Sequence, residues 1–225
     1  MKIVILTAMD KELQLIQSLL ENSCSEVSDE HKIYKGKISA HDIVLAKCGI
    51  GKVNAAINTF RLILSEKPDL ILNTGVAGGA GLKIGSLLIA DQVAYDDVWC
   101  GPGTKYGEAD GCPLFFSASK EILNLALRIC NSENTCFGLI CSGDKFISKA
   151  SEIKFIREHF PEVKAVDMES AAIAQVCYLT DTPFNIIRVV SDTPGEGENI
   201  EQYKNFWQDA PQKTFNLIRE IIEFI

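Results

Sequence analysis

The stretch KIVILTAMDKELQLIQSLL, residues 2–20, changes its pattern halfway and so decides the fold class. Its first six residues, KIVILT, form a short apolar and β-branched run that predicts a strand. From Asp10 onward the apolar residues follow the spacing of an amphipathic helix, at Leu13, Ile16, Leu19 and Leu20. We therefore predict a strand that leads directly into a helix.

The same alternation continues along the chain. Further strands are predicted at 70–74, 86–95, 137–143, 164–168 and 184–192, and further helices at 51–64, 121–130, 151–159, 170–178 and about 201–225. Residues 31–40 and 41–49 read as a hairpin-like pair. Strands that alternate with helices indicate crossover units, and the hairpin adds antiparallel pairing. We predict a single α/β domain over residues 1–225, with a central mixed β-sheet flanked by helices.

Composition excludes several classes of function. The net charge of −8 argues against a nucleic-acid partner and against binding to an anionic membrane surface. The first residues lack the apolar core of a secretory signal, and no run of apolar residues is long enough to span a membrane. The eight cysteines contain no C-x-x-C pair, and the three histidines lack ligand spacing. We expect reduced, mostly buried thiols in a cytoplasmic protein without a metal site.

Acidic residues follow three of the predicted strands. Ligands of α/β sheets bind at the carboxyl ends of strands, which draws attention to Asp10 and Glu12, to Asp167 and Glu169, and to Asp192. Each acid also has a plain structural interpretation, as a helix cap, a first-turn charge or a turn residue. Taken together, these acids favour a catalytic role, because two separated carboxylates that flank a ribosyl bond can serve as general acid and general base.

Other motifs are less specific. The glycines of GVAGG, residues 75–79, fit either a tight turn or a ligand cradle, because glycine allows both positive φ and close backbone approach. The first strand is not followed by G-x-G-x-x-G, which argues against a dinucleotide cofactor, and we expect no cofactor. The chain also lacks the G-x-S-x-G elbow of serine hydrolases.

Six segments together carry a family resemblance. In order, MKIVILTAMDKEL, CGIGKVNAA, NTGVAGG, SGDKFI, AVDMESAAIAQVC and RVVSD resemble the motifs of bacterial 5'-methylthioadenosine/S-adenosylhomocysteine nucleosidases, which belong to the nucleoside phosphorylase superfamily. The match spans about residues 1–192. It implies hydrolysis of the N-glycosidic bond of both nucleosides, with release of adenine and the 5-thio-substituted ribose. That reaction serves methionine salvage and the recycling of methylation by-products.

The resemblance also implies roles for individual residues. Glu12 matches the general base that activates water, and Asp192, beside Ser191, matches the acid that protonates purine N7. Glu169 matches the glutamate that binds the ribose hydroxyls. Because a free aspartic acid has a pKa of about 3.9, an acid that works near neutral pH needs a raised pKa, which burial supplies. The other matched positions contact the nucleoside or line its pocket: Met9, Ile50, Gly78, Phe146, Ile147, Met168 and Arg188.

Three of those positions have more specific roles in the family. Phe146 matches the aromatic residue that stacks on the base, and Ile147 matches the residue whose backbone reads adenine. Arg188 matches an arginine near the water and the ribose.

Water is favoured over phosphate as the nucleophile. The segment TAMDKEL supplies acids where phosphate needs cations, and no arginine precedes Arg61. The alternatives are a purine nucleoside phosphorylase, a nucleosidase for another 5' group such as that of futalosine, and a nucleoside-binding sensor without chemistry. A small nucleoside is the expected ligand in each case.

The chain departs from the family pattern at three places. Val76 replaces a serine found in several members, and Asp167, which we interpret as a supporting or helix-start charge, replaces a common glutamate. The segment Asp96–Glu108 departs most. In the family this loop lines the neighbouring subunit's 5' pocket, so the resemblance implies a homodimer, with Trp99 and Tyr106 as candidate contacts. Three aromatic residues near the C-terminus either cover the 5' group or pack in the core, namely Tyr203, Phe206 and Trp207.

Overall fold

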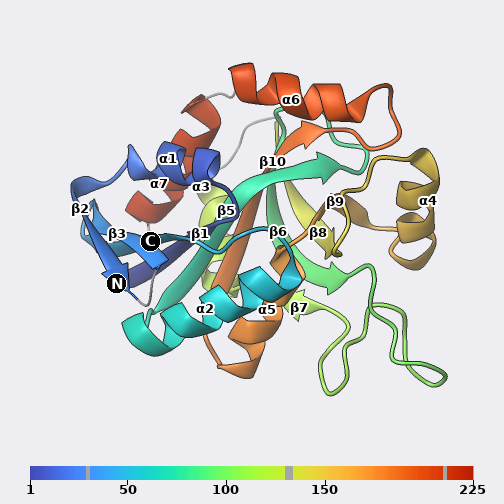
Figure 1. The fold of residues 1–225 in the computed structure, drawn as a ribbon, viewed down its shortest axis with the longest axis horizontal. Coiled ribbons are helices and arrows are strands. Elements are labelled where there is room, and N and C mark those ends of the chain that lie inside the picture. Colours follow the sequence, from blue (N-terminus) through green and yellow to red (C-terminus); the bar gives the residue numbers. More distant parts are fainter. Residues whose placement is uncertain (29–30, 130–133, 210–211, 225) are drawn as a thin grey trace.

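The computed structural model describes residues 1–28, 31–129, 134–209 and 212–224 (Figure 1). Its strands are β1 (Lys2–Thr7), β2 (Glu21–Ser28), β3 (His31–Ile38), β4 (His41–Lys47), β5 (Leu70–Gly79), β6 (Leu87–Tyr95), β7 (Phe116–Ser117), β8 (Thr135–Ser142), β9 (Val163–Asp167) and β10 (Phe184–Asp192). Its helices are α1 (Asp10–Gln17), α2 (Lys52–Glu66), α3 (Lys120–Ile129), α4 (Ala150–His159), α5 (Ser170–Leu179), α6 (Asn199–Asp209) and α7 (Gln212–Phe224).

Strand β5 lies at the centre of the sheet and pairs with three other strands. It pairs in parallel with β1 and β10 and antiparallel with β9. Strand β10 continues to β6, β6 to β8 and β8 to β9, so that β5, β10, β6, β8 and β9 form a closed ring. From β1 the sheet extends outward through β4 and β3 to β2. The predicted α/β fold with a mixed sheet is confirmed, and so is the hairpin of β3 and β4.

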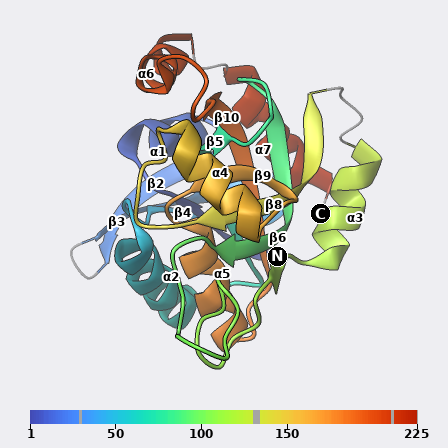
Figure 2. The ribbon, with the colours of Figure 1, turned by 90° about the vertical axis from the view of Figure 1, so that its right-hand side faces the viewer.

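Helices cover both faces of this sheet. Along β1, Ile3 and Ile5 pack into a core with α1, α3 and α7, whereas Val4 and Leu6 pack into a second core with α2 and α5. Figures 1 and 2 show α2 and α5 side by side beneath the sheet, with α1 and α7 on the opposite side. Because both faces are buried, the strands read as continuous apolar runs rather than as an alternation.

Several boundaries differ from the prediction. The helix after β1 ends at Gln17 rather than Leu20, because β2 begins at Glu21; we did not predict β2, whose residues are mostly polar. The predicted C-terminal helix is two helices, α6 and α7, and residues 210–211 between them lie outside the described residues. The glycines at 75–79 form the end of β5 and are not a tight turn.

Two further expectations concern the whole chain. Within the described residues, no helix has the length and apolar character needed to cross a membrane. The described cysteines are free thiols, of which Cys48, Cys112, Cys141 and Cys177 are buried, Cys136 is half-buried, and Cys24 and Cys100 are exposed. Cys130 lies outside the described residues. The assignment of residues 1–225 to one domain stays a prediction.

Candidate active site

The acid-bearing strand ends meet at one pocket. Strands β1, β5 and β10 run parallel, so their carboxyl ends reach the same edge of the sheet. A pocket of about 120 Å³ opens there. Its lining residues are Ala8, Met9, Glu12, Ile50, Val76, Ala77, Gly78, Phe146, Val166, Asp167, Met168, Glu169, Ser191, Asp192 and Tyr203. Nine of the eleven predicted site residues are therefore brought together; the exceptions are Ile147 and Arg188.

Glu12 enters the pocket from the first turn of α1 and is 2% exposed. Its Oε2 accepts the backbone N–H groups of Ala8 and Met9, each at 2.9 Å, and its Oε1 accepts the N–H of Val76 at 3.0 Å. A Cβ at Gly75 would lie 2.5 Å from Oε1, so this close approach requires glycine. Burial raises the pKa of Glu12, and the charge of Arg188 and the three N–H groups oppose that rise. The result is a fixed carboxyl group suited to proton transfer.

Asp192 ends β10 and is also buried. The register of β10 against β5 shifts between Val190 and Asp192, and both Ser191 and Asp192 line the pocket. Oδ1 accepts a hydrogen bond from the Ser191 hydroxyl at 2.7 Å, and Oδ2 accepts one from Asn199 Nδ2 at 3.1 Å. Burial raises the pKa of Asp192, and these two donors oppose the rise. A carboxyl group that keeps its proton to higher pH is suited to the role of general acid.

Glu169 stands where β9 passes into α5. Its Oε1 accepts the N–H of Gly51, at the start of α2, at 2.8 Å. The pKa of Glu169 is raised, first by burial and then by the neighbouring charge of Asp167. Together with Glu12 and Asp192 it gives the pocket three buried carboxyl groups, supplied by separate elements of the chain.

Asp167 and Arg188 form a buried ion pair beside the pocket. Arg188 Nε donates to Asp167 Oδ2 at 2.9 Å, and its Nη2 donates to Asn73 Oδ1 and, at 2.8 Å, to the Ser170 hydroxyl. Asp167 Oδ1 accepts the Ser142 hydroxyl at 2.6 Å and the Ser170 N–H at 3.2 Å. Asp167 thus lies at the start of α5 and supports its neighbours, in keeping with the supporting or helix-start charge that we predicted.

The role predicted for Arg188, near the water and the ribose, stays a prediction. Arg188 is not among the described residues that line the pocket. Its guanidinium is engaged by Asp167, Asn73 and Ser170. Arg188 also acts on the site through its charge, which opposes the raised pKa values of Glu12 and Glu169.

Aromatic and aliphatic residues complete the other end of the site. Phe146, Ile147 and Met168 line a smaller hollow of about 40 Å³ that adjoins Asp192, which is where the structure places Ile147. Tyr203, on α6, closes the larger pocket. Its ring meets that of Phe146 edge to face, with centroids 5.7 Å apart, and its hydroxyl lies 3.3 Å from Met9 Sδ.

The other aromatic candidates lie away from the pocket. Phe206 is buried in the core with α1 and α7, and Trp207 packs against the same core. The Tyr106 hydroxyl donates to the Asp96 carbonyl at 2.7 Å, and its ring packs against Phe155 of α4. The partners of the acids were also missed, because Asn199, Gly51 and Ser142 are small or polar residues in loops and strand ends without a pattern of their own.

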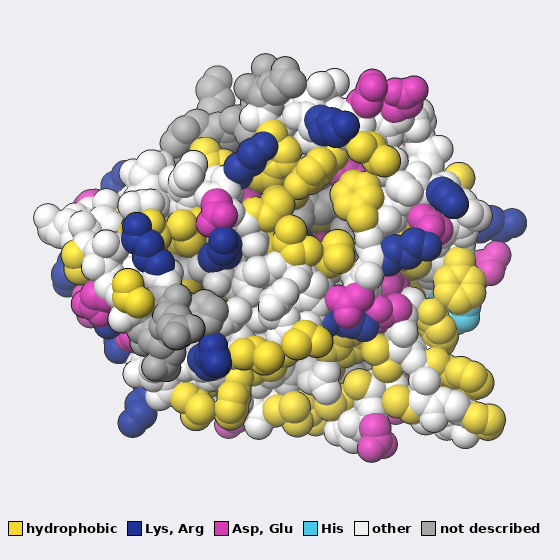
Figure 3. All heavy atoms as spheres, viewed as in Figure 1, with side chains coloured by type: hydrophobic (Ala, Val, Ile, Leu, Met, Phe, Trp, Pro, Cys, Tyr) yellow, Lys and Arg dark blue, Asp and Glu magenta, His cyan; other side chains and the backbone are white. Residues whose placement is uncertain are grey.

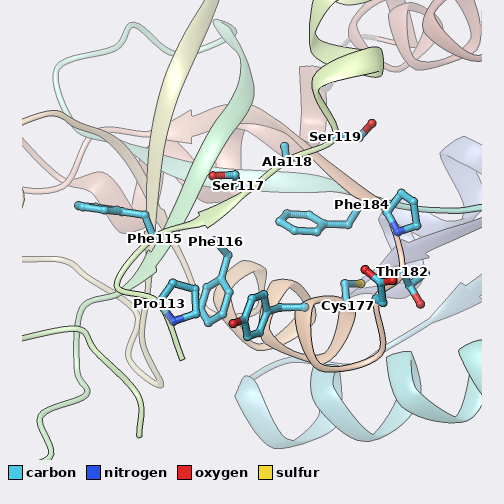
Figure 4. A pocket seen from close by; sticks show the side chains of 12 residues that line it. Pro113, Phe115, Phe116, Ser117, Ala118, Ser119, Cys177, Thr182 and Phe184 are labelled. Atoms are coloured by element: carbon cyan, nitrogen blue, oxygen red, sulfur yellow. The ribbon is translucent and has the colours of Figure 1, made fainter. Parts of the chain in front are cut away.

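A larger cavity, of about 590 Å³, lies elsewhere on the molecule (Figure 4). It is lined by β7 and its neighbours, by the end of α5 and by the start of β10, including Phe115, Phe116 and Phe184. Of the described residues in that lining, only Asp181 carries a carboxyl group. Acid–base catalysis needs at least two correctly placed groups. The pocket of about 120 Å³ that contains Glu12 and Asp192 is therefore the candidate active site.

Comparisons with known proteins show the family of this chain. A model of the phosphorylase superfamily matches residues 2–223. A 5'-methylthioadenosine/S-adenosylhomocysteine nucleosidase of Haemophilus influenzae (strain PittEE) is 38% identical over 228 residues, which cover 99% of either chain. The solved structure of such a nucleosidase from S. pneumoniae, with the transition-state inhibitor MT-ImmA, has a TM-score of 0.95 and 33% identity, and covers 100% of this chain and 99% of that one. The structure from Neisseria meningitidis, in complex with methylthio-immucillin-A, has a TM-score of 0.93 and 36% identity, with coverage of 100% and 99%.

Proposed function

We propose a reaction for this chain on the premise that it belongs to the phosphorylase superfamily and, within it, to the 5'-methylthioadenosine/S-adenosylhomocysteine nucleosidases. The chain is an N-glycosyl hydrolase that cleaves 5'-methylthioadenosine and S-adenosylhomocysteine to adenine and the 5-thio-substituted ribose, a reaction that serves methionine salvage. The observation that carries the proposal is the pair of buried carboxyl groups, Glu12 and Asp192, which enter one pocket from different strand ends with raised pKa values.

The roles of the acids follow from the chemistry of the bond. The leaving purine departs as a neutral base when N7 receives a proton, which Asp192 donates. Glu12, as the carboxylate, accepts a proton from the water that attacks the anomeric carbon from the opposite face of the sugar. Glu169 binds the ribose hydroxyls, and its negative charge stabilises the cationic ribosyl group of the transition state.

The remaining roles concern binding. Adenine lies against Phe146 and the backbone of Ile147, close to Asp192 and Ser191. Met168, Met9, Ile50 and Gly78 surround the nucleoside, as the lining of the pocket supports. Arg188 lies near the attacking water and the ribose, and its guanidinium also holds Asp167.

The charge of the pocket favours water over phosphate. Among the residues that the structure describes, its lining contains four carboxyl groups and neither lysine nor arginine. The guanidinium of Arg188 is paired with one of these acids, because its Nε lies 2.9 Å from Asp167 Oδ2. A phosphate dianion is repelled by such a site, whereas a neutral water molecule is not.

The test is to incubate the protein with 5'-methylthioadenosine, with and without phosphate, and to measure free adenine by chromatography. We expect adenine release that is independent of phosphate. Asp192→Asn should lower kcat by about 10²- to 10⁴-fold, because the general acid is lost. Asp10→Asn is the matched control, since the exposed Asp10 pairs with Lys47 at 2.8 Å outside the pocket. Turnover that requires phosphate and yields ribose 1-phosphate would show a phosphorylase instead.

We further propose a homodimer. Helix α2 exposes Val53, Ile57, Phe60 and Leu64, which follow one face of the helix and are each between 46% and 67% exposed. Figure 3 shows this apolar band along the lower edge of the view, and a patch of this kind marks an interaction site. The loop Asp96–Glu108 lies on the same side of the molecule as α2 and α5 in Figures 1 and 2.

The proposed dimer brings this loop to the neighbouring site. Trp99 is exposed and is the residue that we assign to the partner's 5' pocket, whereas Tyr106 is committed to its own subunit. Ile57→Asp should convert the dimer to a monomer in analytical ultracentrifugation and lower activity at the same time. We also propose a cytoplasmic location, in keeping with the free thiols of the described cysteines.

A further inference from the structure

The loop between β10 and α6 turns back towards the end of β10 (Figure 1). Gly195 and Gly197 adopt φ values of +84° and +64°, which favour glycine. A Cβ at Gly195 would also lie 2.6 Å from the Cα of Ala150. These two glycines let the chain reverse within six residues, so that the first residue of α6, Asn199, returns to Asp192.

The side chain of Asn199 is buried between two parts of the site and is 3% exposed. Its Nδ2 donates to Asp192 Oδ2 at 3.1 Å and to the backbone carbonyl of Ile147 at 3.3 Å. An amide NH₂ group carries two hydrogens, so both bonds form at once. The Ser191 hydroxyl holds the other oxygen of Asp192 at 2.7 Å. Each carboxyl oxygen of Asp192 thus has a fixed donor.

We propose that Asn199 is a positioning residue, which orients the carboxyl group of Asp192 and ties it to the backbone segment that receives the base. This inference rests on the proposed function, because it assigns Asn199 a task in protonation of the leaving purine. Asn199 acts through Asp192 and the Ile147 carbonyl and does not itself transfer the proton. The acid and the base-binding segment are held at a constant separation by one side chain.

A measurable consequence follows for the acid. Hydrogen bonds donated to a carboxylate favour its charged form, so loss of the Asn199 bond raises the pKa of Asp192. The charged or titratable groups that face Asp192 are Asp167, Glu12, Glu169, Tyr203 and Lys145, of which Lys145 is paired with Glu152. Since these groups are unchanged by a substitution at Asn199, a shift in the pH profile reports the lost bond.

The experiment compares Asn199→Ala with Gln202→Ala. Gln202 lies on the same helix and holds the same loop, because its Oε1 accepts the Thr193 N–H at 2.9 Å and its Nε2 donates to the Glu196 carbonyl at 3.1 Å. Its side chain bonds Thr193 and Glu196 rather than Asp192 in the described part of the chain, so it controls for loosening of α6. Both variants are assayed for adenine release from 5'-methylthioadenosine as kcat/KM against pH, and their melting temperatures are recorded.

We expect Asn199→Ala to lower kcat about tenfold and to move the alkaline limb of kcat/KM upward by about one pH unit. Gln202→Ala should leave that limb in place. Asn199→Asp, which keeps the shape of the side chain, should move the limb upward further, because a second carboxyl group then faces Asp192. In an Asp192→Asn background, Asn199→Ala should cause little additional loss.

The outcomes separate the two proposals. If the wild type releases no adenine, the proposed function fails and this inference falls with it. If the wild type is active but neither Asn199 variant moves the alkaline limb, the inference is overturned and the function stands. An equal shift in Gln202→Ala would also overturn it, because the effect would then belong to the anchoring of α6. If Asn199→Ala does not fold, Asn199→Asp decides the question alone.

Discussion

Replacement of Asp167 by asparagine should separate the stability of this protein from its chemistry. The new side chain would keep an oxygen for the Ser142 hydroxyl and the Ser170 N–H, which Asp167 Oδ1 accepts now. Its amide nitrogen would face the Nε–H of Arg188, where a carboxylate oxygen now lies at 2.9 Å. Two donors then oppose each other, and the guanidinium loses its ion-pair partner.

The size of the effect follows from the burial of the pair. The side chains of Arg188 and Asp167 are 3% and 2% exposed, and loss of one member of a buried pair typically costs about 3–5 kcal/mol. Glu12 and Glu169 also attract the guanidinium, which places the expected loss near the lower value, about 3 kcal/mol. For a chain of this length we expect the melting temperature to fall by roughly 6–12 °C.

The assay is thermal and urea denaturation at a fixed protein concentration, alongside adenine release. Glu169→Gln is the matched control, because its amide oxygen still accepts the Gly51 N–H, at 2.8 Å in the wild type. We expect it to fold normally and to lose turnover, whereas Asp167→Asn should be unstable and keep measurable turnover. Adding Arg188→Met to Asp167→Asn should restore stability. A melting temperature of Asp167→Asn within about 1 °C of the wild type would refute the reasoning.

Three further predictions concern neighbouring residues. Burial raises the pKa of Asp96 to about 7, and its Oδ2 has no hydrogen-bond partner in the described part of the chain, so stability falls as pH rises from about 4 to 7. Asp96→Asn should be about 1–2 kcal/mol more stable than the wild type at pH 8 and similar to it at pH 4, as thermal denaturation will show. Tyr203→Ala opens the pocket and should raise KM about tenfold with a smaller change in kcat, a result that a pure packing role excludes. Val76→Ser places a hydroxyl near Glu12 and should lower its pKa, so the acidic limb of kcat/KM should move to lower pH.

The pattern of the chain predicts the parts of the fold that bury apolar surface. β1 and β10 were predicted because their apolar runs are continuous, and the three acids were found because each follows such a run. β2 was missed because a mostly polar strand at the end of the sheet has neither an apolar run nor an alternation. The sequence thus predicts the strands that are buried on both faces of the sheet.

The residues that contact the site residues could not be predicted from the sequence in the same way. Asn199 lies in a glycine- and glutamate-rich segment and reaches Asp192 only because two left-handed glycines reverse the chain. The ion pair of Arg188 with Asp167, 21 residues away, was not predicted, because no local signal shows it. The sequence left Gly75 open between a tight turn and a ligand cradle, whereas in the structure it leaves room for the carboxyl group of Glu12. Each of these facts depends on contacts between distant segments.

The closed ring of β5, β10, β6, β8 and β9 also bears on the order in which the molecule comes apart. Every strand of the ring is hydrogen-bonded along both edges, whereas among the described residues β2 pairs with β3 alone, and α6 covers the ring from outside. In hydrogen–deuterium exchange, amides of the ring should therefore be the last to exchange, and those of β2 and α6 among the first. Asp192 and Asp167 end strands of the ring, whose amides should exchange slowly, whereas Tyr203 belongs to α6, whose amides should exchange quickly. Opening of α6 would therefore leave the strands of the ring paired, although it would break the hydrogen bond from Asn199 to Asp192.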